Sequence, residues 1–159
     1  MVPIHILLFR SSRIDPFPIT HDACDPVGFV IESREGRCGS ATDLGVVTRL
    51  VVEKLRNCRF LNLESNHDPE MLMNGPYPWD LKQRIRSRHG HLSNEESLEL
   101  LHELAHDGLQ ALVMAHLSEV NNHPDHVLRT TGSFLRDQNI CAPSIVIGDQ
   151  FRASCVIEI

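Results

Sequence analysis

The sequence predicts an α/β protein with a mixed sheet flanked by helices. Segments rich in β-branched residues alternate with segments whose apolar residues recur at helical spacing. The length of 159 residues suits one domain, and the composition is 42% hydrophobic and 23% charged. This composition excludes a mainly disordered chain. No apolar run approaches the roughly 20 residues that a membrane-spanning helix needs.

Proline and turn residues define the elements of the first half. Pro16 and Pro18 lack a backbone N–H, so the segment around them is expected to be an edge strand. Glu35 and Gly36 form a turn between two β-branched runs, which predicts a hairpin. The expected order is strand 13–19, strand 27–33, strand 38–42, helix 46–56 and strand 59–63.

Capping residues define the elements of the second half. Ser93 and Glu96 have the spacing of a capping box, so a helix is expected to begin beside them. Pro124 suits the first turn of another helix. The expected order is helix 79–88, helix 94–108 with an apolar stripe that includes Leu98, Leu101 and Leu104, buried strand 109–115, helix 124–136, and a closing hairpin of strands 144–147 and 153–159.

Charge and cysteine content indicate the setting of the protein. The net charge of −6 gives no overall attraction to nucleic acid, so polyanion binding would need a local basic patch. The opening segment, 1–9, lacks the basic start of a signal peptide. The five cysteines form no C-x-x-C pair and are odd in number, which favours a reducing cytoplasmic location over a disulfide framework.

Polar side chains follow several predicted strands at the point where each strand ends. His21, Asp43 and His116 follow three strands, and the strand at 59–63 runs into a polar stretch that contains His67. Ligands of α/β proteins bind outside strand ends. Two imidazoles and a carboxylate could therefore hold Zn, Mn or Fe. The alternatives are a surface or capping role for each histidine and a turn role for Asp43.

Other polar and aromatic residues leave alternatives open. The cationic side chains between 82 and 88 could neutralise phosphates or be a solvated helix face. Tyr77 and Trp79 could stack on bases, although packing beneath their loop is favoured. Four further histidines are interpreted as surface residues: His102, His106, His123 and His126.

Four stretches of the sequence resemble one known family. They are PFPITHDACDPVGFVIE, ATDLG, LNLESNHDPEMLMNGPYPWDLKQRIRSRHGHLSNEES and LVMAHLSEVNNHPD. These stretches resemble the metallo-β-lactamase-fold hydrolases of the YycJ/WalJ-like branch, which is related to the ribonuclease Z and ribonuclease J nucleases. The resemblance implies an αββα sandwich, a dinuclear metal site at one edge, and phosphodiesterase or exonuclease activity on DNA or RNA.

The resemblance implies a role for each matching residue. His21 would complete the ligand set of one metal, Asp43 would bridge two metals, and His116 would bind the second. His67 would have a catalytic role or position the substrate. Four residues are expected near the substrate phosphate: Ser118, Asn121, Asn122 and His91.

The family's main metal motif, H-x-H-x-D-H, has no counterpart in this chain. The nearest string, His89-Gly90-His91, lacks the following Asp-His pair, so His91 is expected at the rim of the site. Residues 1–13 do not match the family, so 14–159 is expected to be the C-terminal part of a metallo-β-lactamase-like domain. Alone, it is expected to be inactive and to bind a divalent metal weakly.

Three alternatives to an independent enzyme are open. The chain could be a non-catalytic α/β module, or half of a split protein that needs a complementing N-terminal chain. The third alternative is a homo-oligomer in which a second copy supplies the missing ligands. A membrane partner is not expected.

Overall fold

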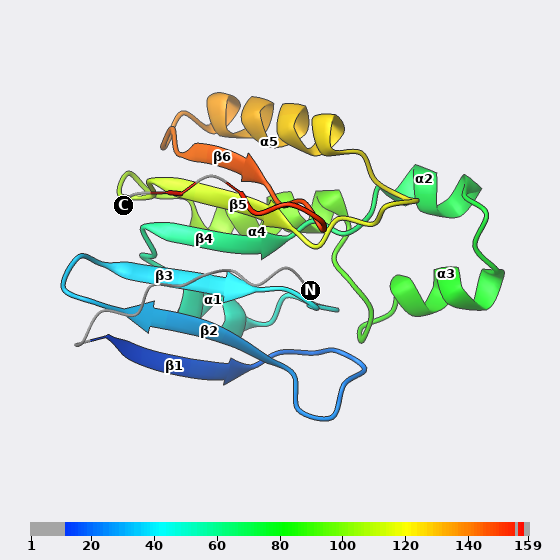
Figure 1. Cartoon of the computed structure of the whole chain (residues 1–159), viewed down its shortest axis with the longest axis horizontal. Helices are drawn as coiled ribbons and strands as arrows, with labels where there is room; N and C mark the ends of the chain where they lie inside the picture. Colours follow the sequence, from blue (N-terminus) through cyan, green and yellow to red (C-terminus); the bar gives the residue numbers. More distant parts are fainter. Residues whose placement is uncertain (1–11, 155, 158–159) are drawn as a thin grey trace.

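The computed structural model describes residues 12–154, 156 and 157. Strands and helices alternate through most of the chain (Figure 1). In order they are β1 (Arg13–Pro18), β2 (Val27–Glu32), β3 (Arg37–Ala41), α1 (Arg49–Leu55), β4 (Phe60–Glu64), α2 (Pro69–Asn74), α3 (Trp79–Ile85), α4 (Asn94–Leu104), β5 (Ala111–Ala115), α5 (Pro124–Gln138) and β6 (Ser144–Ile147).

The strands form one mixed sheet in sequential order, β1-β2-β3-β4-β5-β6. β1, β2 and β3 pair antiparallel, whereas β3, β4, β5 and β6 pair parallel. The expected hairpin therefore forms between β2 and β3, and β1 is the expected edge strand. The α/β class with a mixed sheet and flanking helices is confirmed.

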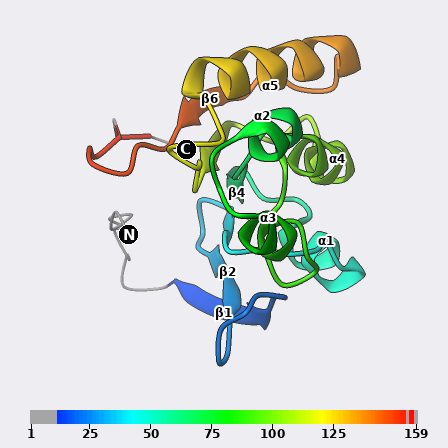
Figure 2. The ribbon, with the colours of Figure 1, turned by 90° about the vertical axis from the view of Figure 1, so that its right-hand side faces the viewer.

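The helices that connect parallel strands cover one face of the sheet. Since the strand order is sequential and such crossovers share one hand, α1, α4 and α5 follow one another on the same side. Figure 2 shows α1 and α4 on the same side of the strands. The core between sheet and helices is apolar, and among its buried residues are Phe17, Val30, Leu55, Leu61, Leu101, Leu112 and Met114.

Local capping explains where the crossover helices begin. The Thr48 hydroxyl accepts from the N–H of Val51 at the start of α1. Ser93 and Glu96 form the expected capping box of α4. Pro124 occupies the first turn of α5.

Several expected boundaries differ from the structure. The first helix begins at Arg49 rather than 46, because its cap is Thr48, and α3 ends at Ile85 rather than 88. α4 ends at Leu104, before the expected stop near 108. The sequence analysis missed α2, although Asp68 and Pro69 are a typical helix start.

The expected closing hairpin is wrong for the described residues. β6 pairs parallel with β5, and 151–154, 156 and 157 are not in a strand. The remainder of the expected last strand, 155 and 158–159, lies outside the described residues, as does the unmatched segment 1–11. Arg13, which the expected domain division assigns to the unmatched segment, begins β1.

The carboxyl ends of β1, β3, β4 and β5 lie at the same edge of the sheet, because two antiparallel pairings return β1 to the direction of β3. Beyond this edge the chain makes an excursion of residues 68–90, which carries α2 and α3 and which we call the arm (Figure 1). The fold therefore places the polar strand ends beside residues 68 and 90, where the arm begins and ends.

Candidate metal centre

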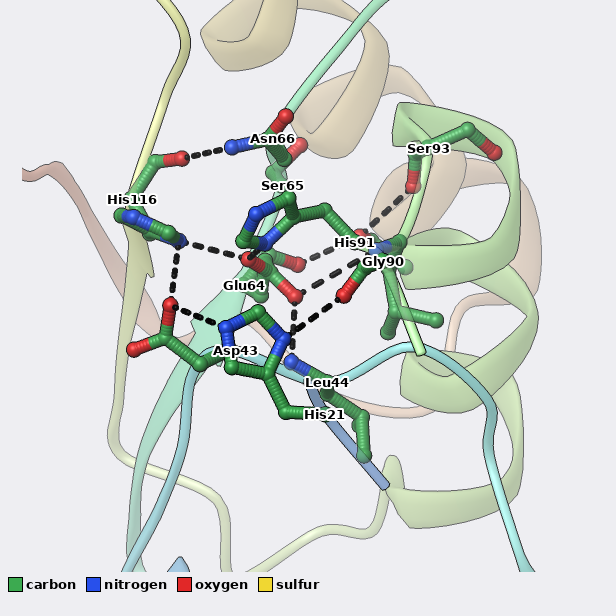
Figure 3. A network of polar contacts seen from close by, with 12 residues as sticks. His21, Asp43, Leu44, Glu64, Ser65, Asn66, Gly90, His91, Ser93 and His116 are labelled. Carbon is green, nitrogen blue, oxygen red and sulfur yellow. Dashed lines mark hydrogen bonds and ion pairs between the residues drawn. The ribbon is translucent and has the colours of Figure 1, made fainter. Parts of the chain in front are cut away.

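Four strands deliver one titratable side chain each to this edge. His21 follows β1, Asp43 follows β3, Glu64 is the last residue of β4, and His116 follows β5. Figure 3 shows these side chains pointing toward one another, together with His91 from the end of the arm. The expectation that polar strand ends meet is therefore confirmed as geometry.

Glu64 is the centre of the network. Its side chain is fully buried, and both carboxylate oxygens are used. Oε2 accepts from the backbone N–H groups of Leu44 at 2.8 Å and Leu92 at 3.3 Å. Oε1 lies 2.8 Å from His91 Nδ1 and 2.6 Å from His116 Nδ1. A carboxylate only accepts, so each imidazole donates from Nδ1 and keeps Nε2 for another partner.

The network shifts the acid–base balance of its members. Burial by itself raises the pKa of Glu64, but hydrogen bonds from His116 and His91 and their charge outweigh burial and lower it. The hydrogen bond to Glu64 raises the pKa of His116 above its ordinary value, against the opposing effect of burial. Glu64 is therefore ionised near neutral pH and holds the two imidazoles by charge-assisted hydrogen bonds.

His21 is held in the same way by a backbone group. Its Nδ1 lies 3.1 Å from the carbonyl oxygen of Gly90, so Nδ1 carries the proton. Its Nε2 then faces the Asp43 carboxylate, 3.6 Å from Oδ1. The same Oδ1 lies 3.6 Å from His116 Nδ1, so Asp43 stands between the two histidines.

His91 fills the space between the other two rings. Its ring centroid lies 4.9 Å from that of His21 and 4.9 Å from that of His116 (Figure 3). Its side chain is 20% exposed, which leaves one side open to a ligand. The expected rim position is consistent with this geometry.

Backbone strain marks two of these positions. Asp43 and His116 both have φ of 58°, in the left-handed region that non-glycine residues rarely adopt. Such strain costs of the order of 1–3 kcal/mol per residue and persists where the surroundings enforce it. Here it turns the two side chains back over the ends of β3 and β5.

Close packing joins the loops of the site. A Cβ on Gly45 would lie 2.3 Å from the Arg88 carbonyl oxygen, so only glycine allows the ATDLG loop to approach the end of the arm. The N–H of Gly45 donates to the Thr20 carbonyl at 2.7 Å, and Asn66 Nδ2 donates to the His116 carbonyl at 2.8 Å. The ligand positions are thus set by contacts between loops.

These residues fit a divalent metal. Asp43, Glu64, His91 and His116 each offer a ligand atom within 4.8 Å of the others; His21 is not part of this group, although its Nε2 lies 3.6 Å from Asp43 Oδ1. Because both Glu64 oxygens are already hydrogen-bonded, we assign Glu64 to orienting the imidazoles. Metal-binding histidines usually donate their second N–H to a carboxylate or a carbonyl, as His116 and His21 do here. Imidazole with carboxylate suits Zn or Mn, and the donors leave the metal's identity open.

The remaining predicted site residues lie around this cluster. His67 is buried at 3% exposure, its Nδ1 has no hydrogen-bond partner among the described residues, and burial lowers its pKa. The Ser118 hydroxyl accepts from the N–H of Asn121, whose own side chain is fully buried. Asn122 is also buried and donates to the carbonyls of Ser65 and Asn66. The substrate contacts expected of these residues stay predictions.

The role of Glu64 was not predicted. Its position could be read from the sequence, because Glu64 directly follows the predicted strand 59–63 as Asp43 and His116 follow theirs, but its hydrogen-bond partners could not. Among the other histidines, His102 and His123 are exposed as expected, whereas His106 is half-buried, with Nε2 3.0 Å from the Cys58 carbonyl oxygen.

Solved structures with similar folds define the class of protein. The YhfI protein of Bacillus subtilis, a metallo-β-lactamase-fold protein, superposes with a TM-score of 0.57 and 15% identity, over 86% of this chain and 47% of that one. A diphosphatase of the PhnP family matches with a TM-score of 0.51 and 16% identity, over 86% and 40%. The chain is therefore an α/β protein with the metallo-β-lactamase fold.

Two sequence relatives are exodeoxyribonucleases. Exodeoxyribonuclease YycJ of Bacillus anthracis is 32% identical over 114 residues, which are 72% of this chain and 43% of the relative. Exodeoxyribonuclease WalJ of Streptococcus pneumoniae strain D39 is 35% identical over 114 residues, 72% of this chain and 42% of the relative. The chain is thus a homologue of the YycJ/WalJ exodeoxyribonucleases and spans less than half of their length. No protein-family profile matches the sequence.

Within the described residues, no helix is long and apolar enough to cross a membrane. The described cysteines, Cys24, Cys38, Cys58 and Cys141, are free thiols.

Proposed function

We propose that this chain carries part of the active site of a divalent-metal-dependent phosphodiesterase that acts on nucleic acid as an exonuclease. The observation that carries the proposal is the position of the Asp43 carboxylate between two histidine rings, with Oδ1 3.6 Å from His21 Nε2 and 3.6 Å from His116 Nδ1, the nitrogen that donates to Glu64. The names of the YycJ and WalJ relatives support DNA as the substrate. A cytoplasmic location, suggested by the free thiols, belongs to the same proposal.

His21, Asp43 and His116 would hold the metal, Zn or Mn, with Asp43 able to bridge two ions. A divalent ion there would supply Lewis-acid activation of water and stabilise charge on the phosphate. In its doubly protonated form, with Nδ1 donating to Glu64, His91 would donate from Nε2 to the phosphate. His67, which its lowered pKa keeps neutral at pH 7, would accept a proton. Ser118, Asn121 and Asn122 would line the phosphate side.

Metal binding by the purified chain tests the site. Calorimetric titration with Zn²⁺ and with Mn²⁺ is expected to show weak binding of one ion, lost in His116→Ala and Asp43→Asn. His102→Ala, an exposed histidine on α4, is the matched control and should bind normally. Equal metal binding by the wild type and His116→Ala would contradict the proposed site.

Hydrolysis of a labelled DNA strand tests catalysis. By itself the chain is expected to be inactive, because the donors at this edge are too few for a normal dinuclear site. Two tightly bound ions together with phosphodiester hydrolysis, both lost in His116→Ala, would contradict this part of the proposal. Activity that appears only on adding an N-terminal chain with the H-x-H-x-D-H motif would support it.

The orienting role of Glu64 has its own test. In Glu64→Gln an amide N–H would face the two Nδ1 atoms, so both imidazoles would shift their proton to Nε2. Metal affinity is expected to fall about 10–100-fold, with the fold retained. Long-range ¹⁵N–¹H spectra should report the tautomer change at His91 and His116. Unchanged tautomers and unchanged affinity would contradict the role.

The outer face of the sheet favours the alternative of a module that needs a partner. Ile14, Val27 and Phe29 lie on the face opposite the core, and they are 47%, 36% and 40% exposed. Contiguous apolar patches of this kind mark interaction sites. A complementing chain would cover this face in a split protein, and a second copy would cover it in a homo-oligomer.

Sizing by light scattering, with and without metal, distinguishes these arrangements. A stable metal-free monomer would favour an independent module over a homo-oligomer. A dimer that Phe29→Lys dissociates would favour the second copy. Phe151→Lys is the control, since Phe151 is 79% exposed and lies outside the sheet.

A further inference from the structure

We propose that the arm is a binding platform for a single strand of DNA, on which Trp79 stacks a base and Arg86 and Arg88 contact phosphates. The proposal rests on the function proposed above, because it assigns to the arm the substrate of the metal centre. It concerns a surface outside the cluster of metal-ligating residues.

Trp79 is an exposed aromatic side chain on a rigid support. It is the first residue of α3 and is 56% exposed, so the expected packing beneath its loop is wrong for this residue. The preceding Pro78 fixes the backbone direction into the helix. An exposed aromatic ring offers a face on which a base can stack, and every nucleotide has a suitable face.

Arg86 lies on the same side of the arm as Trp79. Arg86 is the C-cap of α3, in helical backbone geometry seven positions after Trp79, which places the two on one helix face about 10 Å apart along the axis. The Arg86 Nη1 atom is 3.4 Å from the Met73 sulfur, so the guanidinium reaches across to α2. Since sulfur is a weak acceptor, the cation stays available to a stronger one such as phosphate.

The other charges of the arm show which cations are available. Arg84 is occupied by Asp22, with its Nε 2.6 Å from Oδ2. Arg86 and Arg88 are exposed and form no ion pair with any described residue. Exposed carboxylates on the arm, Glu70 and Asp80, reduce the local positive charge, so the electrostatic part of binding is expected to come from the two contacts of Arg86 and Arg88 and to weaken as salt rises.

Lys82 belongs to the support of the platform and not to its cationic surface. It is buried, and its ammonium donates to the backbone carbonyls of Met73 at 2.7 Å and Gly75 at 2.8 Å. These bonds fasten the end of α2 to α3. The platform is therefore held in shape before a ligand arrives, which lowers the cost of binding.

The C-terminal end of the arm, at residues 89 and 90, lies beside the metal centre. The Gly90 carbonyl bonds to His21, and the His89 carbonyl accepts from the N–H of Asp22 at 3.0 Å. His91, the next residue, faces Glu64. A strand held by Trp79, Arg86 and Arg88 would thus run toward the proposed phosphate site. A single strand is favoured over a duplex because its bases can leave the stack to meet Trp79.

Fluorescence of Trp79, the single tryptophan of the chain, tests the platform directly. The full chain is titrated with a dT oligonucleotide in EDTA, so that hydrolysis plays no part. Saturable quenching is expected, and it should be much weaker with a blunt duplex of the same length. Absence of quenching while the labelled strand still binds, or equal quenching by the duplex, would overturn the proposal.

Fluorescence anisotropy of a labelled strand measures the variants. Trp79→Ala should weaken binding about 5- to 150-fold. The pair Arg86→Gln and Arg88→Gln should reduce the salt slope by about 1.4. Arg49→Gln, at an arginine whose side chain is 92% exposed on α1, is the control and should bind like the wild type. Unchanged affinity in Trp79→Ala, or an unchanged slope in the double variant, would overturn the proposal.

One further measurement separates this proposal from the function proposed for the metal centre. The wild-type chain in EDTA is expected to bind the dT strand, because the platform requires no metal. If the wild type binds neither Zn²⁺ nor Mn²⁺ but this strand binding holds, the platform stands and the proposed metal centre falls. If strand binding fails in correctly folded protein that binds metal, the platform falls alone.

Discussion

The Glu64 network and the arm lie at the same edge of the sheet, but they differ in exposure. The network buries its central carboxylate, whereas the arm leaves charged and aromatic side chains exposed to solvent. Glu64 is fully buried and receives four hydrogen bonds. On the arm, Trp79 is 56% exposed, and the cations of Arg86 and Arg88 have no carboxylate partner among the described residues. The first region satisfies its charges internally, whereas the second leaves binding capacity at the surface.

Because of this difference, we expect the Glu64 network to contribute mainly to stability and the arm to contribute mainly to ligand binding. A buried carboxylate with complete hydrogen bonding orders the loops that donate to it, so its removal should be felt throughout the fold. An exposed platform on a fastened backbone can change its side chains at little cost to folding. Substitutions in the Glu64 network are therefore expected to lower stability, whereas substitutions of exposed residues on the arm are expected to change ligand binding.

The largest effect is expected at Glu64. Glu64→Ala removes an acceptor shared by Leu44, Leu92, His91 and His116 and should lower the free energy of unfolding by about 3–5 kcal/mol. Urea denaturation in EDTA measures it. Glu99→Ala, an exposed carboxylate on α4, is the control and should change stability by less than about 0.5 kcal/mol. A loss of under about 1 kcal/mol at Glu64 would contradict its central position.

Lys82 belongs to the arm in sequence but resembles Glu64 in its surroundings. Lys82→Met keeps the apolar stem and leaves two carbonyls unpaired, so stability should fall by about 1–3 kcal/mol. Limited proteolysis should also cut within 68–90 faster. Gln83→Met, at the exposed next position, should do neither. Equal protease resistance of both variants would show that the arm is held by other contacts.

Stability is expected to fall both at low pH, because of Glu64, and at high pH, because of His116; we call the second decline the upper limb. The lowered pKa of Glu64 makes its contribution complete above its ordinary value of 4.5 and lost as pH falls through its folded-state pKa. The raised pKa of His116 makes its contribution complete below 6.5 and lost as pH rises through its folded-state pKa. Burial lowers the pKa of His67, so its effect on stability has the opposite sign to that of His116: stability is lost as pH falls below 6.5 through the folded-state pKa of His67.

His116→Asn isolates the upper limb, because asparagine tolerates the left-handed backbone at this position. In EDTA, the decline in wild-type stability above pH 6.5 should be smaller in the variant. His102→Asn, exposed on α4, should decline like the wild type. Parallel curves for the wild type and His116→Asn would show that the pair with Glu64 contributes no pH-dependent stability.

The sequence predicted the strands and helix caps at this edge of the sheet better than the hydrogen-bond network around Glu64. Proline positions, the Ser93 capping box and the polar strand ends predicted β1, α4 and the meeting of His21, Asp43 and His116, since each depends on local pattern. The role of Glu64 depends on partners 20 to 52 residues away in the chain, which no local pattern contains. The exposure of Trp79 likewise depends on how α2 and α3 pack.

Errors at the ends of elements have a related cause. Helix 46–56 was extended over residues with apolar spacing, whereas the Thr48 hydroxyl determines where α1 begins. The expected closing hairpin pairs two segments that are neighbours in the sequence, yet β6 pairs with the distant β5, in the register Ala111↔Ser144. Apolar pattern identifies the element, and caps or distant pairing determine its limits.

The smallest effect on stability is expected at Trp79. Trp79→Ala removes a side chain that is more than half exposed, so the free energy of unfolding should change by about 1 kcal/mol or less. Leu72→Ala on the same arm is the contrasting variant: Leu72 is fully buried, and its truncation should cost about 2–5 kcal/mol. Urea denaturation of both measures the contrast. A cost at Trp79 close to that at Leu72 would mean that the ring supports the fold, and the division between a structural network and a binding arm would then be wrong.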